Sequence, residues 1–122
     1  MVPERFTFAL SEIKSKVESI AGVTFTTCLL NLYRDGSDSN GWHSDDEKEL
    51  GQNPVIASVS LGAERIFKFR NRNDHSITEK IILDSGSLLL MKRETQHNWH
   101  HQIPKTTRKI APRINLTFRI IK

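Results

Sequence analysis

A histidine and an aspartate stand two positions apart in the polar segment at residues 41–47. If this segment is extended, His43 and Asp45 point to the same side, since side chains alternate along a strand. An imidazole and a carboxylate that converge on one point supply two of the three ligands of a 2-His-1-carboxylate site for non-heme Fe(II). His-x-Asp pairs are common on protein surfaces, so a metal site needs support from the rest of the chain.

The third metal ligand is expected among the histidines near position 100. On a strand that covers residues 97–103, His97 and His101 share one side and His100 takes the other. Spacing does not choose between His97 and His101. His75 falls in a predicted turn, where we expect a solvated loop residue.

A strictly alternating segment at residues 113–121 carries two arginines on its polar face. Four apolar side chains form one face, and the other is formed by Arg113, Asn115, Thr117 and Arg119. In one interpretation the polar face lies in solvent. In the other it lines a pocket, where the two arginines, roughly 20 Å apart along the strand, lean together to hold both ends of a small dianion. Arginine suits that role because its planar fork makes paired hydrogen bonds to a carboxylate.

One helix and about eight short strands are predicted to position these residues. Apolar residues at spacings of three and four predict an amphipathic helix over residues 7–20, capped by Gly22. Besides the extended segment around His43, alternating or β-branched runs predict strands at 23–33, 54–61, 65–70, 77–83, 87–91, 97–103 and 113–121. The expected fold class is mainly β, a double-stranded β-helix or jelly roll, with the helix packed outside.

Length and composition indicate a soluble globular protein with a single domain at 1–122. The chain has 122 residues, of which 37% are hydrophobic and 26% charged. No apolar run reaches the roughly 18 residues of a membrane span, so no membrane partner is expected. The single cysteine, Cys28, excludes an internal disulfide and is expected in the core of a cytoplasmic protein, or a nuclear one in a eukaryote.

The formal net charge of +4 permits a polyanionic partner such as nucleic acid. A basic stretch formed by Lys68, Arg70 and Arg72 is the candidate contact for a nucleic-acid backbone. A solvated face is the alternative interpretation of the same stretch.

Several segments, in the right order, resemble the AlkB-type Fe(II)- and 2-oxoglutarate-dependent dioxygenases. They lie at residues 31–33, 41–47, 56–63, 86–91, 99–104 and 111–119. The resemblance covers nearly the whole chain, and the Arg-x-Asn-x-Thr-x-Arg strand is highly specific to this family. The sequence Gly-Trp-His-Ser-Asp-Asp-Glu at 41–47 is most similar to the human-type members that repair alkylated DNA and RNA.

The resemblance implies a role for each matching residue. It makes His43, Asp45 and His101 the iron ligands, and it selects His101 through the Trp-x-His-x-x-Pro context. It assigns 2-oxoglutarate binding to Asn31, Tyr33, Arg113, Asn115, Thr117 and Arg119, the last of these also counted as catalytic. Near the substrate base it places Asp46 and Glu47, for which a solvated acidic loop is the alternative, and Arg72 is a further candidate for substrate contact.

The activity implied by the resemblance is oxidative demethylation of N-alkylated bases such as 1-methyladenine and 3-methylcytosine. It uses Fe(II), O2 and 2-oxoglutarate and releases succinate, CO2 and formaldehyde. The expected partner is alkylated single-stranded DNA or RNA, bound by a monomer. Alternatives are an oxygenase acting on a protein or small molecule, and a jelly roll that binds metal without turnover. Few residues precede the first core strand, so the substrate-recognition region is expected to be short or truncated.

Overall fold

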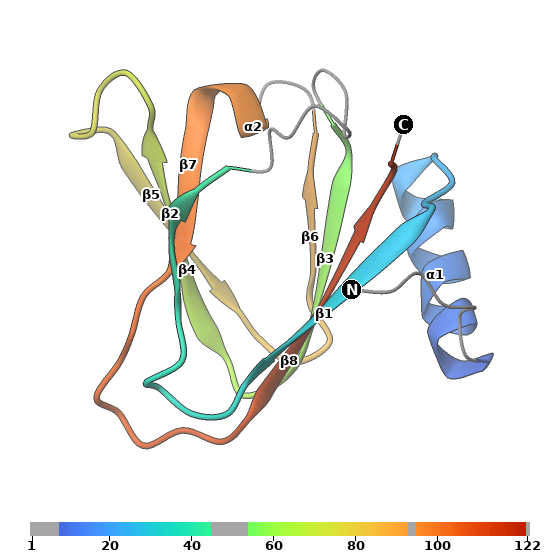
Figure 1. The fold of residues 1–122 in the computed structure, drawn as a ribbon, viewed down its shortest axis with the longest axis horizontal. Helices are drawn as coiled ribbons and strands as arrows, with labels where there is room; N and C mark the ends of the chain where they lie inside the picture. Colours follow the sequence, from blue (N-terminus) through green and yellow to red (C-terminus); the bar gives the residue numbers. More distant parts are fainter. Residues whose placement is uncertain (1–7, 45–53, 93–94, 122) are drawn as a thin grey trace.

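The computed structural model describes residues 8–44, 54–92 and 95–121, and its strands form two facing antiparallel sheets (Figure 1). The elements are α1 (Phe8–Ala21), β1 (Thr27–Tyr33), β2 (Asn40–His43), β3 (Ile56–Gly62), β4 (Arg65–Asn71), β5 (Thr78–Leu83), β6 (Leu88–Met91), α2 (Thr95–Asn98), β7 (Trp99–Ile103) and β8 (Arg113–Arg119). The major sheet has the order β1-β8-β3-β6, and the minor sheet has the order β2-β7-β4-β5. The predicted mainly β jelly roll with an outer helix is confirmed.

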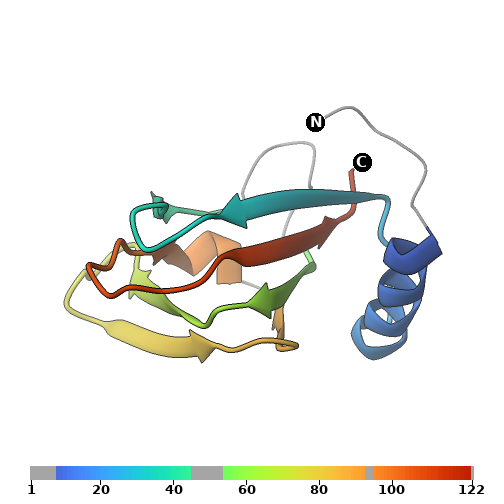
Figure 2. The same ribbon diagram turned by 90° about the horizontal axis from the view of Figure 1, so that it is seen from below.

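Helix α1 packs on the outer face of the major sheet, away from the minor sheet (Figures 1 and 2). Its buried Val17 joins a core that includes Phe25 and Phe118, whose ring centroids lie 5.9 Å apart. The helix ends as predicted: Gly22 has φ +76°, and its amide donates to the Glu18 carbonyl at 2.8 Å. Among the described residues, no helix combines the length and apolar character that crossing a membrane requires.

A second core fills the space between the two sheets. It draws side chains from both sheets: Tyr33, Ile56, Phe67, Leu83, Met91 and Ile103. Strand β3 is buried on both faces, because Ala57 and Val59 pack in the first core and Ile56 packs in the second. Full burial of one large apolar side chain stabilises a protein by ~1.5–3 kcal/mol. The second core therefore holds the two sheets together, and the first holds α1 against the major sheet.

The predicted strand at 97–103 is wrong over its first two residues. Residues 95–98 form the short helix α2, and β7 begins only at Trp99. Hydrogen bonds stabilise this turn at both ends, since the Thr95 hydroxyl donates to the Lys92 carbonyl at 2.8 Å and the Arg72 amide donates to the Asn98 carbonyl at 2.9 Å. His97 therefore belongs to a helical turn and does not share a strand with His101.

Candidate active site

The polar face of β8 points into the space between the sheets, so the interpretation that placed it in solvent is wrong. Arg113 and Asn115 are 1% and 6% exposed, whereas Ile114 on the other face is 37% exposed. Strand β8 lies between β1 and β3, and Asn115 pairs with Asn31 on one side and Ser60 on the other. A cavity of about 90 Å³ is lined by all six predicted cosubstrate residues, namely Asn31, Tyr33, Arg113, Asn115, Thr117 and Arg119, together with His43 and His101.

Two serines of β3 orient the polar side chains of β8. Arg113 Nη2 donates to Ser60 Oγ at 2.9 Å, and Asn115 Nδ2 donates to Ser58 Oγ at 2.5 Å. The Thr117 hydroxyl donates to Asn115 Oδ1 at 2.6 Å. The sequence assigns these serines no role, because local periodicity does not show which strand lies beside β3.

Arg113 is a buried cation with unused hydrogen-bonding capacity. Among the described residues, its Nε and Nη1 atoms have no hydrogen-bond partner. Burial lowers the pKa of its guanidinium, yet arginine stays charged in proteins. A buried charge with unmade hydrogen bonds is costly unless an anion pairs with it. This end of the cavity is therefore suited to a carboxylate.

The two histidines stand side by side on neighbouring strands of the minor sheet. His43 on β2 pairs with His101 on β7, and their ring centroids are 4.4 Å apart at an interplanar angle of 71°. The Nδ1 atom of His43 lies 2.7 Å from the Gly41 carbonyl oxygen. Because a carbonyl only accepts, Nδ1 carries a proton in this contact, and Nε2 is the nitrogen that remains for a metal. This is the orientation that metal-binding histidines commonly show.

His101 is held in its neutral form by its surroundings. It is 2% exposed, and the Phe67 ring stacks on it with a centroid distance of 5.1 Å. Burial, followed by the charges of His43 and His100, lowers the pKa of His101 to about 3. A neutral imidazole is the form that binds a metal. Its Nε2 lies 3.0 Å from Gln96 Oε1, so ligation through Nε2 would replace that hydrogen bond.

The carboxylate predicted as the third ligand, Asp45, lies outside the described residues, as do Asp46 and Glu47. Within residues 8–44, 54–92 and 95–121, no three His, Cys, Asp or Glu side chains gather into a metal-binding group. Among the described residues, the two neighbouring imidazoles suit a divalent metal. The buried Arg113 guanidinium, with its unpaired N–H groups, suits a carboxylate of a dicarboxylate ligand.

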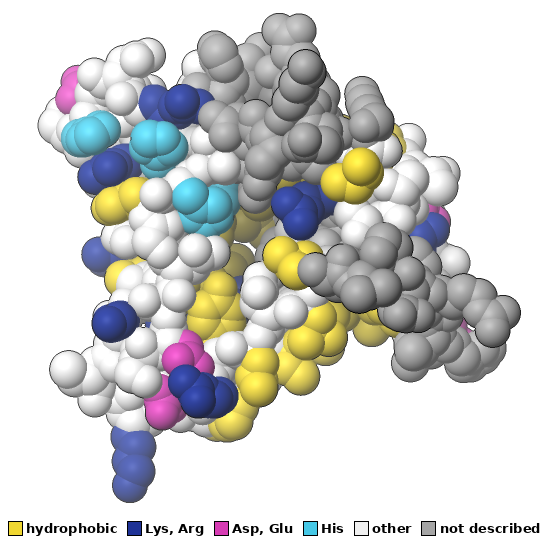
Figure 3. Space-filling view, in the orientation of Figure 1, with side chains coloured by type: hydrophobic (Ala, Val, Ile, Leu, Met, Phe, Trp, Pro, Cys, Tyr) yellow, Lys and Arg dark blue, Asp and Glu magenta, His cyan; other side chains and the backbone are white. Residues whose placement is uncertain are grey.

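The three residues of the basic stretch make different contacts. The Arg72 guanidinium donates to the Gln96 carbonyl at 3.2 Å and so lies against α2, not in the cavity. The Arg70 guanidinium lies 4.4 Å from the centroid of the Trp42 ring. Lys68 is paired across β4 and β5 with a second lysine, Lys80. Figure 3 shows Lys and Arg side chains along the edge of the molecule formed by the minor sheet.

Comparisons with known proteins agree with this geometry. The family described as the 2OG-Fe(II) oxygenase superfamily matches residues 2–119. The chain is 45% identical over 120 residues to the Homo sapiens alpha-ketoglutarate-dependent dioxygenase alkB homolog 3, covering 92% of this chain and 42% of that protein. It is 40% identical over 126 residues to the Homo sapiens DNA oxidative demethylase ALKBH2, covering 98% of this chain and 48% of that protein.

A solved structure supports the fold independently. The structure of OsALKBH1 superimposes with a TM-score of 0.66 at 23% sequence identity, covering 94% of this chain and 61% of that chain. At this identity the likeness concerns the fold alone. The chain spans less than half the length of the two human relatives.

Proposed function

The chain belongs to the 2OG-Fe(II) oxygenase superfamily, and from this premise we propose that it is an Fe(II)- and 2-oxoglutarate-dependent dioxygenase that demethylates N-alkylated bases. One observation carries the proposal: a buried arginine with orphaned donors and two neighbouring imidazoles line the same cavity. Metal binding alone does not require a carboxylate site beside the metal. A cavity with both kinds of residue would suit a metal together with a dicarboxylate cosubstrate.

His43, Asp45 and His101 are proposed to hold Fe(II). When bound, the metal supplies the oxidising chemistry: O2, 2-oxoglutarate and an N-methyl group yield succinate, CO2, formaldehyde and the unmethylated base. The protein contributes orientation and exclusion of water. Its Gly41 carbonyl fixes the His43 tautomer, and burial keeps His101 neutral.

The polar face of β8 is proposed to hold 2-oxoglutarate. Arg113 and Arg119 pair with its carboxylates, and Asn115 and Thr117 line the space between them. From β1, the adjacent strand, Asn31 and Tyr33 contact the same molecule. The Ser60 hydroxyl supports this arrangement by fixing Arg113 Nη2, which leaves the other guanidinium nitrogens to the ligand.

The proposed substrates are 1-methyladenine and 3-methylcytosine in single-stranded DNA or RNA. One relative, human ALKBH2, is a DNA oxidative demethylase, which supports this substrate class. The net positive charge supports a polyanionic partner. A base reaches such a cavity only when it is out of the stack, and a single strand does not require the few kcal/mol that flipping it from a duplex costs. Asp46, Glu47 and Arg72 are proposed to contact the substrate.

The test is formaldehyde release from matched single-stranded and duplex oligonucleotides that carry 1-methyladenine, with succinate measured in parallel. We expect release from both and a preference for the single strand. The matched controls are an unmethylated oligonucleotide and His43→Ala, which should fold normally but release no formaldehyde, because the two apolar cores do not include His43. Succinate formation without formaldehyde from any methylated oligonucleotide would contradict the proposed substrate. The proposed oxygenase activity would still stand.

A further inference from the structure

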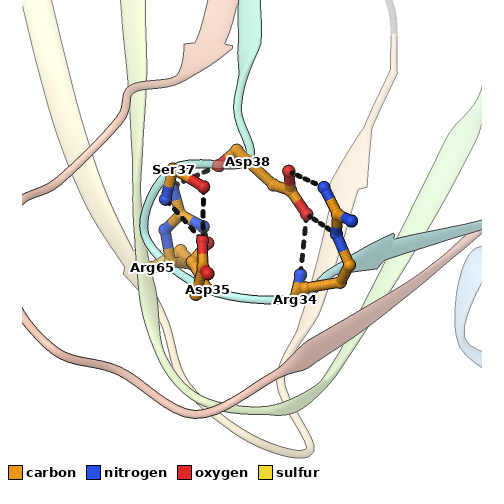
Figure 4. Close-up of polar contacts among 5 residues, drawn as sticks. All are labelled: Arg34, Asp35, Ser37, Asp38 and Arg65. Atoms are coloured by element: carbon orange, nitrogen blue, oxygen red, sulfur yellow. Dashed lines mark hydrogen bonds and ion pairs between the residues drawn. The ribbon is translucent and has the colours of Figure 1, made fainter.

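Arg65, the first residue of β4, is a buried cation that no role described so far uses. It is 4% exposed, and its guanidinium points inward on the same face of β4 as Phe67. Its guanidinium donates to backbone carbonyls: Nη1 donates to Asp35 at 3.3 Å, and Nη2 donates to Asp38 at 2.9 Å (Figure 4). Nη2 also donates to the Pro104 carbonyl at 2.8 Å. Each terminal nitrogen therefore donates to at least one backbone carbonyl of the protein.

The three carbonyls belong to the two connections that lead into the candidate site. Residues 34–39 link β1 to β2, and residues 104–112 link β7 to β8. The two connections also touch directly, since the Thr106 amide donates to the Gly36 carbonyl at 2.9 Å. Arg65 thus joins the segment between Tyr33 and His43 to the segment between His101 and Arg113.

Arg65 also shares an aromatic ring with the proposed cosubstrate arginine. Its guanidinium carbon lies 5.5 Å from the centroid of the Tyr33 ring, and that of Arg113 lies 5.0 Å from the same centroid. Both distances allow a cation–π contact. Two buried guanidinium groups on one ring repel each other, and an anion at this place would relieve that repulsion.

We propose that Arg65 is a positioning residue for the dicarboxylate cosubstrate. It fixes the Tyr33 ring and the strand ends on either side, so that Arg113 presents its free donors to a carboxylate. Arg65 acts through Tyr33 and Arg113 and does not touch the ligand, because it does not line the cavity. The inference rests on the proposed function, in that it takes 2-oxoglutarate as the ligand of this cavity.

The variants that test it are Arg65→Gln, Arg65→Lys and the control Arg34→Ala. Arg34 pairs with Asp38 at 2.9 Å on the same connection but is exposed, so its removal leaves the carbonyl contacts of Arg65 in place. Two affinities are measured by calorimetry without any oligonucleotide, first Mn(II) alone and then 2-oxoglutarate with Mn(II) present. The Michaelis constants for 2-oxoglutarate and for methylated oligonucleotide are compared as a third readout.

We expect Arg65→Gln to weaken 2-oxoglutarate binding by roughly tenfold or more, equivalent to the loss of about one hydrogen bond at the ligand. Its Mn(II) affinity and its Michaelis constant for oligonucleotide should stay near the wild-type values. Arg65→Lys should recover part of the loss, since an ammonium donates to carbonyls but has no planar face for the ring. Arg34→Ala should bind 2-oxoglutarate like wild type.

Two results would overturn the role of Arg65. One is wild-type 2-oxoglutarate affinity in Arg65→Gln, or in Arg65→Lys if the glutamine variant does not fold. The other is an equal loss for Mn(II), 2-oxoglutarate and oligonucleotide, which a purely structural residue would give. Failure of the wild-type protein to bind 2-oxoglutarate would instead overturn the proposed function, so the two failures are distinguishable.

Discussion

Arg119 offers the most direct test at the scale of single side chains. It lines the cavity at the opposite end of β8 from Arg113. Arg119→Ala should weaken 2-oxoglutarate binding by roughly ten- to more than a hundredfold, because a charge-assisted hydrogen bond contributes about 1.5–3 kcal/mol. Arg119→Lys should restore only part of the affinity, since an ammonium lacks the bidentate fork. Calorimetric titration with Mn(II) present measures both, and unchanged affinity in the alanine variant would remove Arg119 from the cosubstrate site.

Cys28 is expected to be chemically inert in the folded protein. Its side chain lies in the first core, and burial raises the pKa of the thiol to about 11. The reactive thiolate is therefore scarce at pH 8, and a disulfide reagent should label Cys28 slowly in buffer and rapidly in denaturing urea. Fast stoichiometric labelling of the native protein at pH 8 would contradict the burial.

The raised pKa of the Cys28 thiol also makes the stability of the protein depend on pH in the alkaline range. In the unfolded chain the thiol ionises near its ordinary pKa of 9.0, before the folded one does. The folded state therefore holds the proton more tightly between pH 9 and about pH 11, and this contribution to stability falls as the pH rises through that window. Well below pH 9 the contribution of Cys28 is constant. The difference in urea midpoints between wild type and Cys28→Ala, followed from about pH 8 to about pH 11, measures it.

At the scale of elements, the contact between the two connections predicts a strict requirement for glycine. Gly36 is buried, and a Cβ at this position would meet the carbonyl and the side chain of Thr106. Gly36→Ala should destabilise the protein by about 1–3 kcal/mol, the usual cost of forcing an extra carbon into a packed site. Urea denaturation measures the change. Gly41→Ala is the matched control, because a Cβ added there would meet no described residue within 4 Å apart from its chain neighbours. Equal stability of the two variants would refute the packing argument.

The elements that local sequence predicts correctly are those that carry their own periodicity. Helix α1 has an apolar stripe and a terminal glycine, and β8 has strict alternation, so neighbouring residues suffice for both. Helix α2 has only four residues and no stripe. Its ends are stabilised by hydrogen bonds with Lys92 and Arg72, which belong to no helix motif. For that reason the sequence misplaces His97 on a strand.

The residues of the candidate site also fall into a group that the sequence predicts and a group that it does not. Residue types and family resemblance predict the polar face of β8 and the convergence of His43 with His101. They do not predict the contributions of Ser60, Gln96 and Arg65, because each depends on which strands become neighbours in space. Strand register is set by long-range packing, and a single sequence does not state it.

At the scale of the whole molecule, the distribution of positive charge predicts salt-sensitive binding of nucleic acid. Lys68 and Lys80 lie opposite each other across β4 and β5, a like-charge pair that is unfavourable by itself. Affinity for a single-stranded oligonucleotide should fall as salt rises, with a log–log slope of about −0.7 for each phosphate contacted. Fluorescence anisotropy over a salt series measures the slope.

Two variants test whether the outer face of the minor sheet, which carries Lys68 and Lys80, contributes to nucleic-acid binding. Lys68→Gln with Lys80→Gln should make the slope shallower by about one to one and a half. Lys16→Gln, an exposed change on α1 at the far side of the molecule, should leave it unchanged. An identical slope in wild type, the double variant and Lys16→Gln would mean that the outer face of the minor sheet does not contact the nucleic-acid backbone.

The position of β8 has a consequence for how the protein is made. Residues 113–119 are translated after every other described strand, yet β8 lies in the interior of the major sheet between β1 and β3. Until residues 113–119 leave the ribosome, β1 and β3 have no β8 between them, so each has an unpaired edge. The nascent chain also lacks both arginines of the proposed cosubstrate site. Pairings that span most of the chain form slowly and expose strand edges meanwhile. A chain that stalls before β8 would therefore be an aggregation hazard as well as an inactive one, and chaperones should stay bound to it at least until β8 inserts.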